Sequence, residues 1–201
     1  ASAWVQQYAR HIASELHGPI ALLRLKSGEA VLELVSGNGV IHQPHEPVAS
    51  SLGGALSAAA REAAALLVRT DETTEPRLAE LAGLDTLTLL SGADEAATVA
   101  SYRTIKNLTA RMDAVERQPA IRLAIMGASA SQATEASARI ERAASAFLNR
   151  NVRVTSCISK IGGGKSTLLY RGPIHEPVES ILRSLRQHFV PAPARAPHSA
   201  P

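Results

Sequence analysis

The sequence is short of cysteine, of aromatic side chains and of long apolar runs, and each shortage excludes a class of protein. Cys157 is the only cysteine among 201 residues, so no disulfide can form within the chain, and we expect a reducing, cytoplasmic setting. Aromatic residues make up 3% of the chain, which argues against a nucleic-acid surface built on base stacking. No uninterrupted apolar run approaches about 18 residues, so no membrane-spanning helix is predicted. The first residues are not typical of a signal peptide.

The composition is instead that of a globular protein. Hydrophobic residues make up 45% of the chain and charged residues 19%, which is enough to bury a core. The length favours one domain, which we place at residues 1–190, followed by a disordered Pro/Ala-rich tail at 191–201. The net charge of +3 comes from 21 basic and 18 acidic residues spread along the chain. No dense basic stripe indicates DNA or lipid binding, although a peripheral membrane contact stays open.

Segments of helical and strand periodicity alternate along the chain. The patterns predict helices over 4–16, 52–63, 75–81, 94–112, 132–148 and 177–189, and strands over 20–25, 30–35, 65–70, 86–90, 121–126 and 152–158. Strands separated by helices of this length imply crossover connections. The sequence therefore predicts an α/β fold of three layers, α/β/α, with a mostly parallel central sheet.

Several local patterns are best explained by structure alone. Val99, Tyr102, Ile105 and Leu108 lie on one side of the helix 94–112, and we expect the stripe of Tyr102, Ile105, Leu108 and Met112 in the core. The residues after the strand 121–126 predict a loop in which Ser129 or Ser131 caps the following helix.

No metal site is predicted from the sequence. His42 and His45 lie close together, but two prolines near them break any helical register, and no third ligand has the spacing that zinc requires. Cys157 falls inside a predicted buried strand, where a thiol is inert.

A segment rich in glycine and lysine follows the last predicted strand and resembles a phosphate-binding loop. It reads Lys160-Ile161-Gly162-Gly163-Gly164-Lys165-Ser166-Thr167. In such loops glycines let backbone N–H groups converge on phosphate oxygens, a lysine neutralises the outer phosphates, and a hydroxyl holds magnesium. Ser159 stands where the full Walker spacing needs its first glycine, and Ile161 stands where a variant of the loop needs one.

Two interpretations of this segment stay open. A phosphate loop has to lead into a helix whose N-terminal N–H groups face the anion. Here the chain reaches Gly172-Pro173 within a few residues, which leaves room for little more than one helical turn. A basic surface loop is therefore the favoured interpretation. The alternative is an ATP site in which Lys160 and the glycines Gly162, Gly163 and Gly164 surround the phosphates, Lys165 neutralises them and Ser166 holds magnesium.

The order of segments from about residue 64 to 189 matches that of a known family. A predicted strand ends at Asp71. The next one leads into a helix that holds Tyr102 and an Ile105-Lys106 pair. A further strand and helix end at Phe147-Leu148, and a Gly-Pro step precedes the last helix. This order resembles the second half of the MinD/ParA/FlhG class of P-loop ATPases. The resemblance implies a Rossmann-like P-loop fold with Asp71 at the acidic position of the switch loop, and residues 1–50 as a divergent N-terminal part.

The chain departs from the family at the residues that bind nucleotide. The first strand leads into Lys26-Ser27-Gly28-Glu29, which is too short to wrap a triphosphate. Gly127-Ala128-Ser129 stands where the family usually has the asparagine that recognises adenine. The resemblance thus implies a degenerate member with no catalytic residues, since a switch carboxylate has no role without bound phosphates.

The sequence therefore predicts a protein-interaction or scaffolding module in cellular organisation rather than an enzyme, with no cofactor. The resemblance implies a protein partner or self-association, because the family forms face-to-face dimers, and it implies roles at the cell pole, in division, or in flagellar or secretion assemblies. The alternative prediction is an ATPase that uses residues 162–166 with ATP and magnesium.

Overall fold

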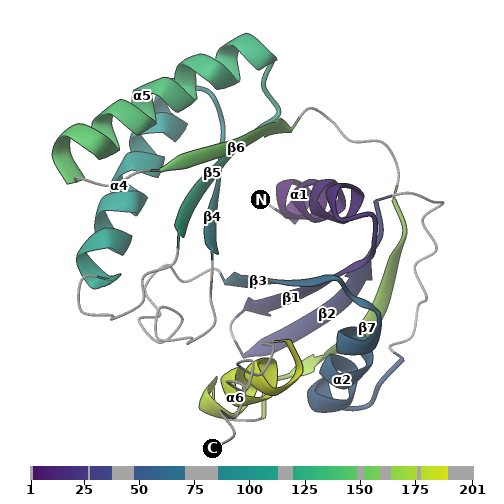
Figure 1. Ribbon diagram of the computed structural model, residues 1–201. Coiled ribbons are helices and arrows are strands. Elements are labelled where there is room, and N and C mark those ends of the chain that lie inside the picture. Colours follow the sequence, from purple (N-terminus) through teal and green to yellow (C-terminus); the bar gives the residue numbers. More distant parts are fainter. Residues whose placement is uncertain are drawn as a thin grey trace, which may run out of the picture.

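The protein has a mixed α/β fold, seen in a computed structural model that describes residues 2–26, 28–37, 48–70, 86–112, 120–148, 152–158, 164–175 and 178–189 (Figure 1). The helices of this part are α1 (Ser2–Glu15), α2 (Leu52–Glu62), α4 (Glu95–Met112), α5 (Ala130–Leu148) and α6 (Val178–Phe189). The strands are β1 (Ile20–Lys26), β2 (Glu29–Val35), β3 (Ala65–Thr70), β4 (Thr86–Ser91), β5 (Ala120–Met126), β6 (Arg153–Ile158) and β7 (Ser166–Pro173). The helix predicted over 75–81 lies outside the described residues.

The strands form two sheets. Their orders are β3-β1-β2-β7 and β4-β5-β6. The second sheet is parallel throughout. In the first sheet, β1 pairs in parallel with β3, whereas β1–β2 and β2–β7 are antiparallel. The predicted α/β class is confirmed, but the expectation of a mostly parallel sheet holds for β4–β6 only, because the first sheet is mixed.

The antiparallel pairing of β1 with β2 has a local cause. Lys26 pairs with Glu29 across a two-residue turn, and a connection this short can join only antiparallel strands. Gly28 has φ +83° in this turn, a backbone conformation that glycine adopts without strain. Residues 166–173, for which no strand is predicted from the sequence, pair with β2 as β7.

Each sheet has α1 on one face and a pair of helices on the other. Alternate residues of β1 face opposite sides, so that Leu22 packs toward α1 and Leu23 packs into the core under α2 and α6. In β5, Ile125 packs against the helices α4 and α5, whereas Met126 faces α1. Figure 1 shows α1 lying between the two sheets.

Tyr8 of α1 joins the two halves of the structure. Its side chain is 7% exposed and packs with Ala124 and Met126 of β5, while Leu67 of β3 packs against the same cluster. The Tyr8 hydroxyl lies 3.2 Å from the hydroxyl of Thr88 on β4. The two sheets are therefore held in one structure through α1.

The start of α5 confirms one of the two caps predicted for it. The Ser129 hydroxyl accepts a hydrogen bond from the backbone N–H of Gln132 at 3.4 Å, and the Gln132 side chain accepts one from the backbone N–H of Ser129 at 3.1 Å. This reciprocal pair is a capping box. Asp94 caps α4 through the backbone N–H of Ala97 at 2.8 Å.

Among the described residues, no helix is both long enough and apolar enough to cross a bilayer.

Candidate functional site

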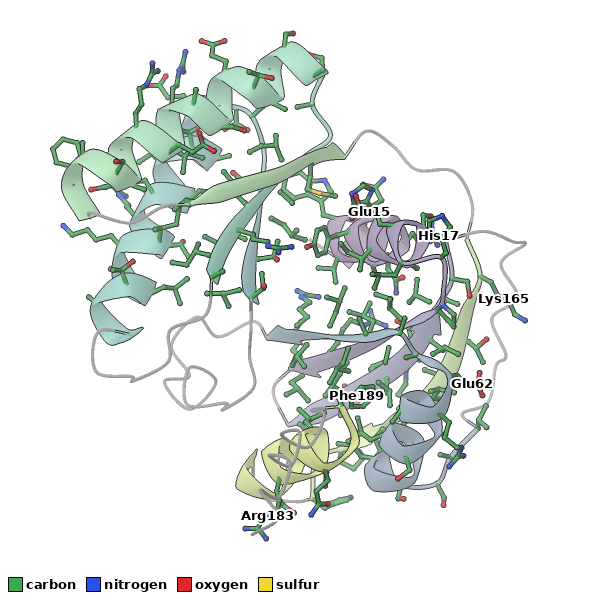
Figure 2. The ribbon with its side chains drawn as sticks, viewed as in Figure 1. Glu15, His17, Glu62, Lys165, Arg183 and Phe189 are labelled. Atoms are coloured by element: carbon green, nitrogen blue, oxygen red, sulfur yellow. The ribbon has the colours of Figure 1, made fainter. Side chains whose placement is uncertain are left out.

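The predicted phosphate-binding segment is described only at its end. Gly164 and Lys165 precede β7, and Ser166 is the first residue of that strand. Lys165 is exposed, and Figure 2 shows its side chain extending away from the sheet into solvent. The other predicted nucleotide residues, Lys160, Gly162 and Gly163, and the switch-like Asp71 lie outside the described residues.

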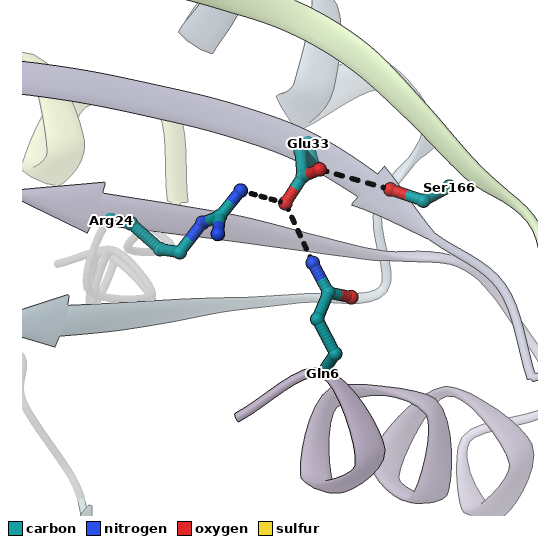
Figure 3. A network of polar contacts seen from close by, with 4 residues as sticks. All are labelled: Gln6, Arg24, Glu33 and Ser166. Carbon is teal, nitrogen blue, oxygen red and sulfur yellow. Dashed lines mark hydrogen bonds and ion pairs between the residues drawn. The ribbon is translucent and has the colours of Figure 1, made fainter. Parts of the chain in front are cut away.

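Ser166 belongs to a buried polar cluster around Glu33. The Glu33 side chain is 9% exposed, and its carboxylate accepts three hydrogen bonds from three different elements (Figure 3). The donors are the Arg24 guanidinium of β1 at 2.6 Å, the Gln6 amide of α1 at 2.7 Å and the Ser166 hydroxyl of β7 at 3.3 Å. A buried carboxylate needs such partners, so Glu33 ties α1, β1 and β7 to β2.

This polar cluster is only partly satisfied. Three buried atoms near this cluster have no hydrogen-bond partner among the described residues. They are the amide oxygen of Gln6, Nε of Arg24 and Nε of the neighbouring Arg10. Each such group is costly in a protein interior. The cluster thus depends heavily on the bonds that Glu33 does make.

Gly164 has a packing role that requires no phosphate. A Cβ atom at this position would lie 2.6 Å from the backbone oxygen of Ser36 and 2.9 Å from Cδ of Arg10. The backbone N–H of Ser36 also donates to the carbonyl of Lys165 at 2.8 Å. The absence of a side chain at Gly164 lets the β2 end, β7 and α1 approach one another at this point.

The described end of this segment does not fit the phosphate and magnesium roles that the ATP alternative gives it. Ser166 opens a strand rather than a helix, so no helix N-terminus follows the glycines. The Ser166 hydroxyl is buried and donates to Glu33. No mechanistic step through ATP or magnesium is derived from these residues.

A second candidate site lies on the outer helices of the parallel sheet. Phe147 near the end of α5 is 77% exposed, and its ring makes an edge-to-face contact with Tyr102 of α4 at a centroid distance of 6.5 Å. Val99, one turn before Tyr102 on α4, is 44% exposed. An edge-to-face arrangement is one of the preferred geometries of aromatic pairs.

Two basic residues follow the aromatic residue of α4. They are Arg103 and Lys106, and both are exposed. Neither has an ion pair or hydrogen bond among the described residues, whereas Glu135 and Arg139 of α5 bond to each other. We refer to Val99, Tyr102, Arg103, Lys106 and Phe147 as the α4–α5 surface.

The core stripe predicted on α4 is correct in part. Ile105 is fully buried and Leu108 packs against the same cluster under α4 and α5, as expected. Tyr102 is only partly buried, and its ring contacts the exposed Phe147 instead of joining this cluster. The side chain of Met112 lies outside the described part of the chain. The exposure of Phe147 has no signal in the sequence, since helical spacing places it in line with the buried Ile140.

The sequence analysis missed Glu33 as a site residue, although a signal was present. Val31, Glu33 and Val35 alternate along β2 and therefore share one face, and Val35 is buried against α1. A lone acid on a buried face predicts a polar partner, but the register that supplies Arg24 and Ser166 is not readable from the sequence.

Metal ligands do not gather in the described part of the chain, where no group of three or more His, Cys, Asp or Glu side chains could hold an ion. His42 and His45 lie outside the described residues.

A scan of family models finds none that matches this chain, and a search of curated proteins finds no match either.

Proposed function

We propose that the chain is a protein-interaction or scaffolding module, and that its α4–α5 surface binds a protein partner. The observation that carries the proposal is the 77% exposure of Phe147 in contact with Tyr102. The chain has only six aromatic residues, one Trp, three Tyr and two Phe. Aromatic side chains packed against each other at a surface are the residues that most often anchor protein–protein interfaces.

The proposal includes a frame of the MinD/ParA type that does not hydrolyse nucleotide and acts in the cytoplasm. The two sheets are taken as halves of one three-layer α/β/α frame. This is supported by the placement of the helices, since α1 packs on one face of both sheets, and α2, α6, α4 and α5 pack on the opposite faces. The burial of Ser166 against Glu33 supports a frame without a phosphate site.

An ATPase that uses residues 162–166 is the second candidate function. The observation in its favour is the exposed Lys165 beside the glycine segment, which leaves an ammonium group available to an anion. The burial of Ser166 and the strand that follows it weigh against this candidate.

The proposed function is tested by panning a library of random 12-residue peptides on phage against the immobilised chain. We expect peptides that bind the wild-type chain and lose about tenfold or more in affinity for a Phe147→Asp variant, because the anchoring ring is replaced by a charge. Phe147 is exposed, so the variant should keep the urea midpoint of the parent.

Val48→Asp serves as the matched control. Val48 is also a large apolar residue at the surface, 66% exposed, and it lies on neither α4 nor α5. Peptides that bind through the α4–α5 surface should bind this variant like the parent. The proposal is wrong if no peptide is enriched, or if the enriched peptides bind Phe147→Asp as tightly as the parent.

A further inference from the structure

We propose that the α4–α5 surface selects a partner segment in which acidic side chains stand next to an apolar one, with the acidic end lying over Arg103 and Lys106. The inference rests on the proposed function and specifies the chemistry of its partner. It follows from the order of residues along α4, in which Val99 and Tyr102 are each followed by a basic residue four positions later.

The apolar and basic residues of α4 form a compact four-residue group. Val99 and Tyr102 are three residues apart, as are Arg103 and Lys106. Val99 precedes Arg103 by four residues, and Tyr102 precedes Lys106 by four, so each apolar side chain has a cation one turn further along the same face. Phe147 of α5 adds its ring to the apolar end through its contact with Tyr102.

Acidic and basic residues lie at opposite ends of this group along α4. Arg103 and Lys106 are exposed, and neither has an acidic partner among the described residues. Glu95, one turn before Val99, is the acid on the same side of α4. An acidic partner segment is therefore attracted at the Lys106 end and repelled at the Glu95 end, which fixes the orientation in which it docks.

The other charges of α5 do not face this group. Glu135 and Arg139 are paired with each other. At about 100° per residue, Glu141 points about 120° away from Phe147 around the helix, and Arg142 about 140° away. Within the described part of the chain, the charge without an ion pair next to Tyr102 and Phe147 is thus positive, which is the complement of an acidic segment.

A protein segment fits this surface better than an anionic membrane does. Recognition of anionic lipids by surface charge uses clusters of about four to eight Lys or Arg residues. The α4–α5 surface offers two, with Glu95 beside its apolar end. Two cations next to two aromatic rings match the scale of a short peptide with one apolar anchor and a few carboxylates.

The inference is tested with a focused display library on the whole chain. The peptides carry one fixed leucine, and the flanking positions are drawn at random from Asp, Glu, Gln and Lys. Each exposed charge pair changes affinity by about two- to fivefold. Two pairs together should therefore enrich acidic over basic flanks by about tenfold on the wild-type chain. On an Arg103→Glu/Lys106→Glu variant this preference should reverse, and on Phe147→Asp no peptide should be enriched.

Equal enrichment of acidic and basic flanks on the wild-type chain, or the same acidic preference on the double variant, overturns the inference. Phe147-dependent peptides without acidic preference would leave the proposed function standing and remove only the inference, whereas no Phe147-dependent peptide removes both. Binding to phosphatidylserine vesicles, or dimerisation in sedimentation, that is lost in Arg103→Glu/Lys106→Glu would also overturn it, since the occupant would then be a membrane or a second copy.

Discussion

Replacing Tyr8 by alanine should lower the free energy of unfolding by about 3–5 kcal/mol, the range seen when a buried aromatic ring is removed from a core. Tyr8 is 7% exposed and contacts β5 of one sheet in a cluster that also holds Leu67 of the other. The cavity left by the ring would open between the two sheets. The measurement is urea unfolding followed by circular dichroism, with the slope checked for a change in cooperativity.

Tyr8→Phe is the matched control, because it removes the hydroxyl and keeps the ring. It should cost about 1 kcal/mol, the usual net value of one hydrogen bond such as that between Tyr8 and Thr88. If Tyr8→Ala were no more costly than Tyr8→Phe, then α1 would not be packed between the sheets as described.

Replacing Glu33 by alanine should cost about 3 kcal/mol, because removal of one partner of a buried ion pair leaves the other charge uncompensated. The Arg24 side chain is 22% exposed, so water relieves part of this loss and the value falls at the lower end of the range for buried pairs. Gln6 and Ser166 lose their acceptor in the same variant. The free energy of unfolding in urea gives the result.

Two variants separate the buried charge from a mere loss of contacts. Glu33→Gln removes the negative charge but keeps a carbonyl acceptor for Arg24, so it should retain most of the cost of Glu33→Ala if the uncompensated charge is the main loss. Glu135→Ala removes the exposed pair with Arg139 on α5, and pairs of this kind contribute only about 0.3–0.5 kcal/mol. A Glu33→Ala effect as small as that of Glu135→Ala would show that the Glu33 cluster does not hold α1 and β7 to the sheet.

The sequence predicts the helices and most strands because their patterns are local. Apolar spacing marks α4 and α5, and the residues after the strand 121–126 indicate Ser129 or Ser131 as a cap, of which Ser129 is the one observed. The topology is harder to obtain. The two-residue turn after Lys26 requires that β1 and β2 pair antiparallel. The alternation of helices and strands along the rest of the chain instead favours a parallel sheet, so the prediction for β1 and β2 followed the wrong signal.

Long-range pairing explains what was missed at the candidate sites. Ser166 and Glu33 are 133 residues apart, so neither β7 nor its bond to Glu33 follows from local sequence. The glycine and lysine residues before Ser166 therefore resemble a phosphate loop, whereas in the structure Gly164 and Lys165 lead directly into β7. Phe147 was missed for a different reason. Helical spacing gives the direction of a side chain, but not whether a neighbouring helix extends far enough to cover it.

The most direct test of the central claim, that this α/β frame lacks the means to hold a triphosphate, is titration of the chain with ATP and magnesium in a calorimeter. The account predicts no saturable heat, for the parent or for Lys165→Ala. Magnesium-dependent binding by the parent that Lys165→Ala abolishes would contradict it, and would assign residues 162–166 to nucleotide binding.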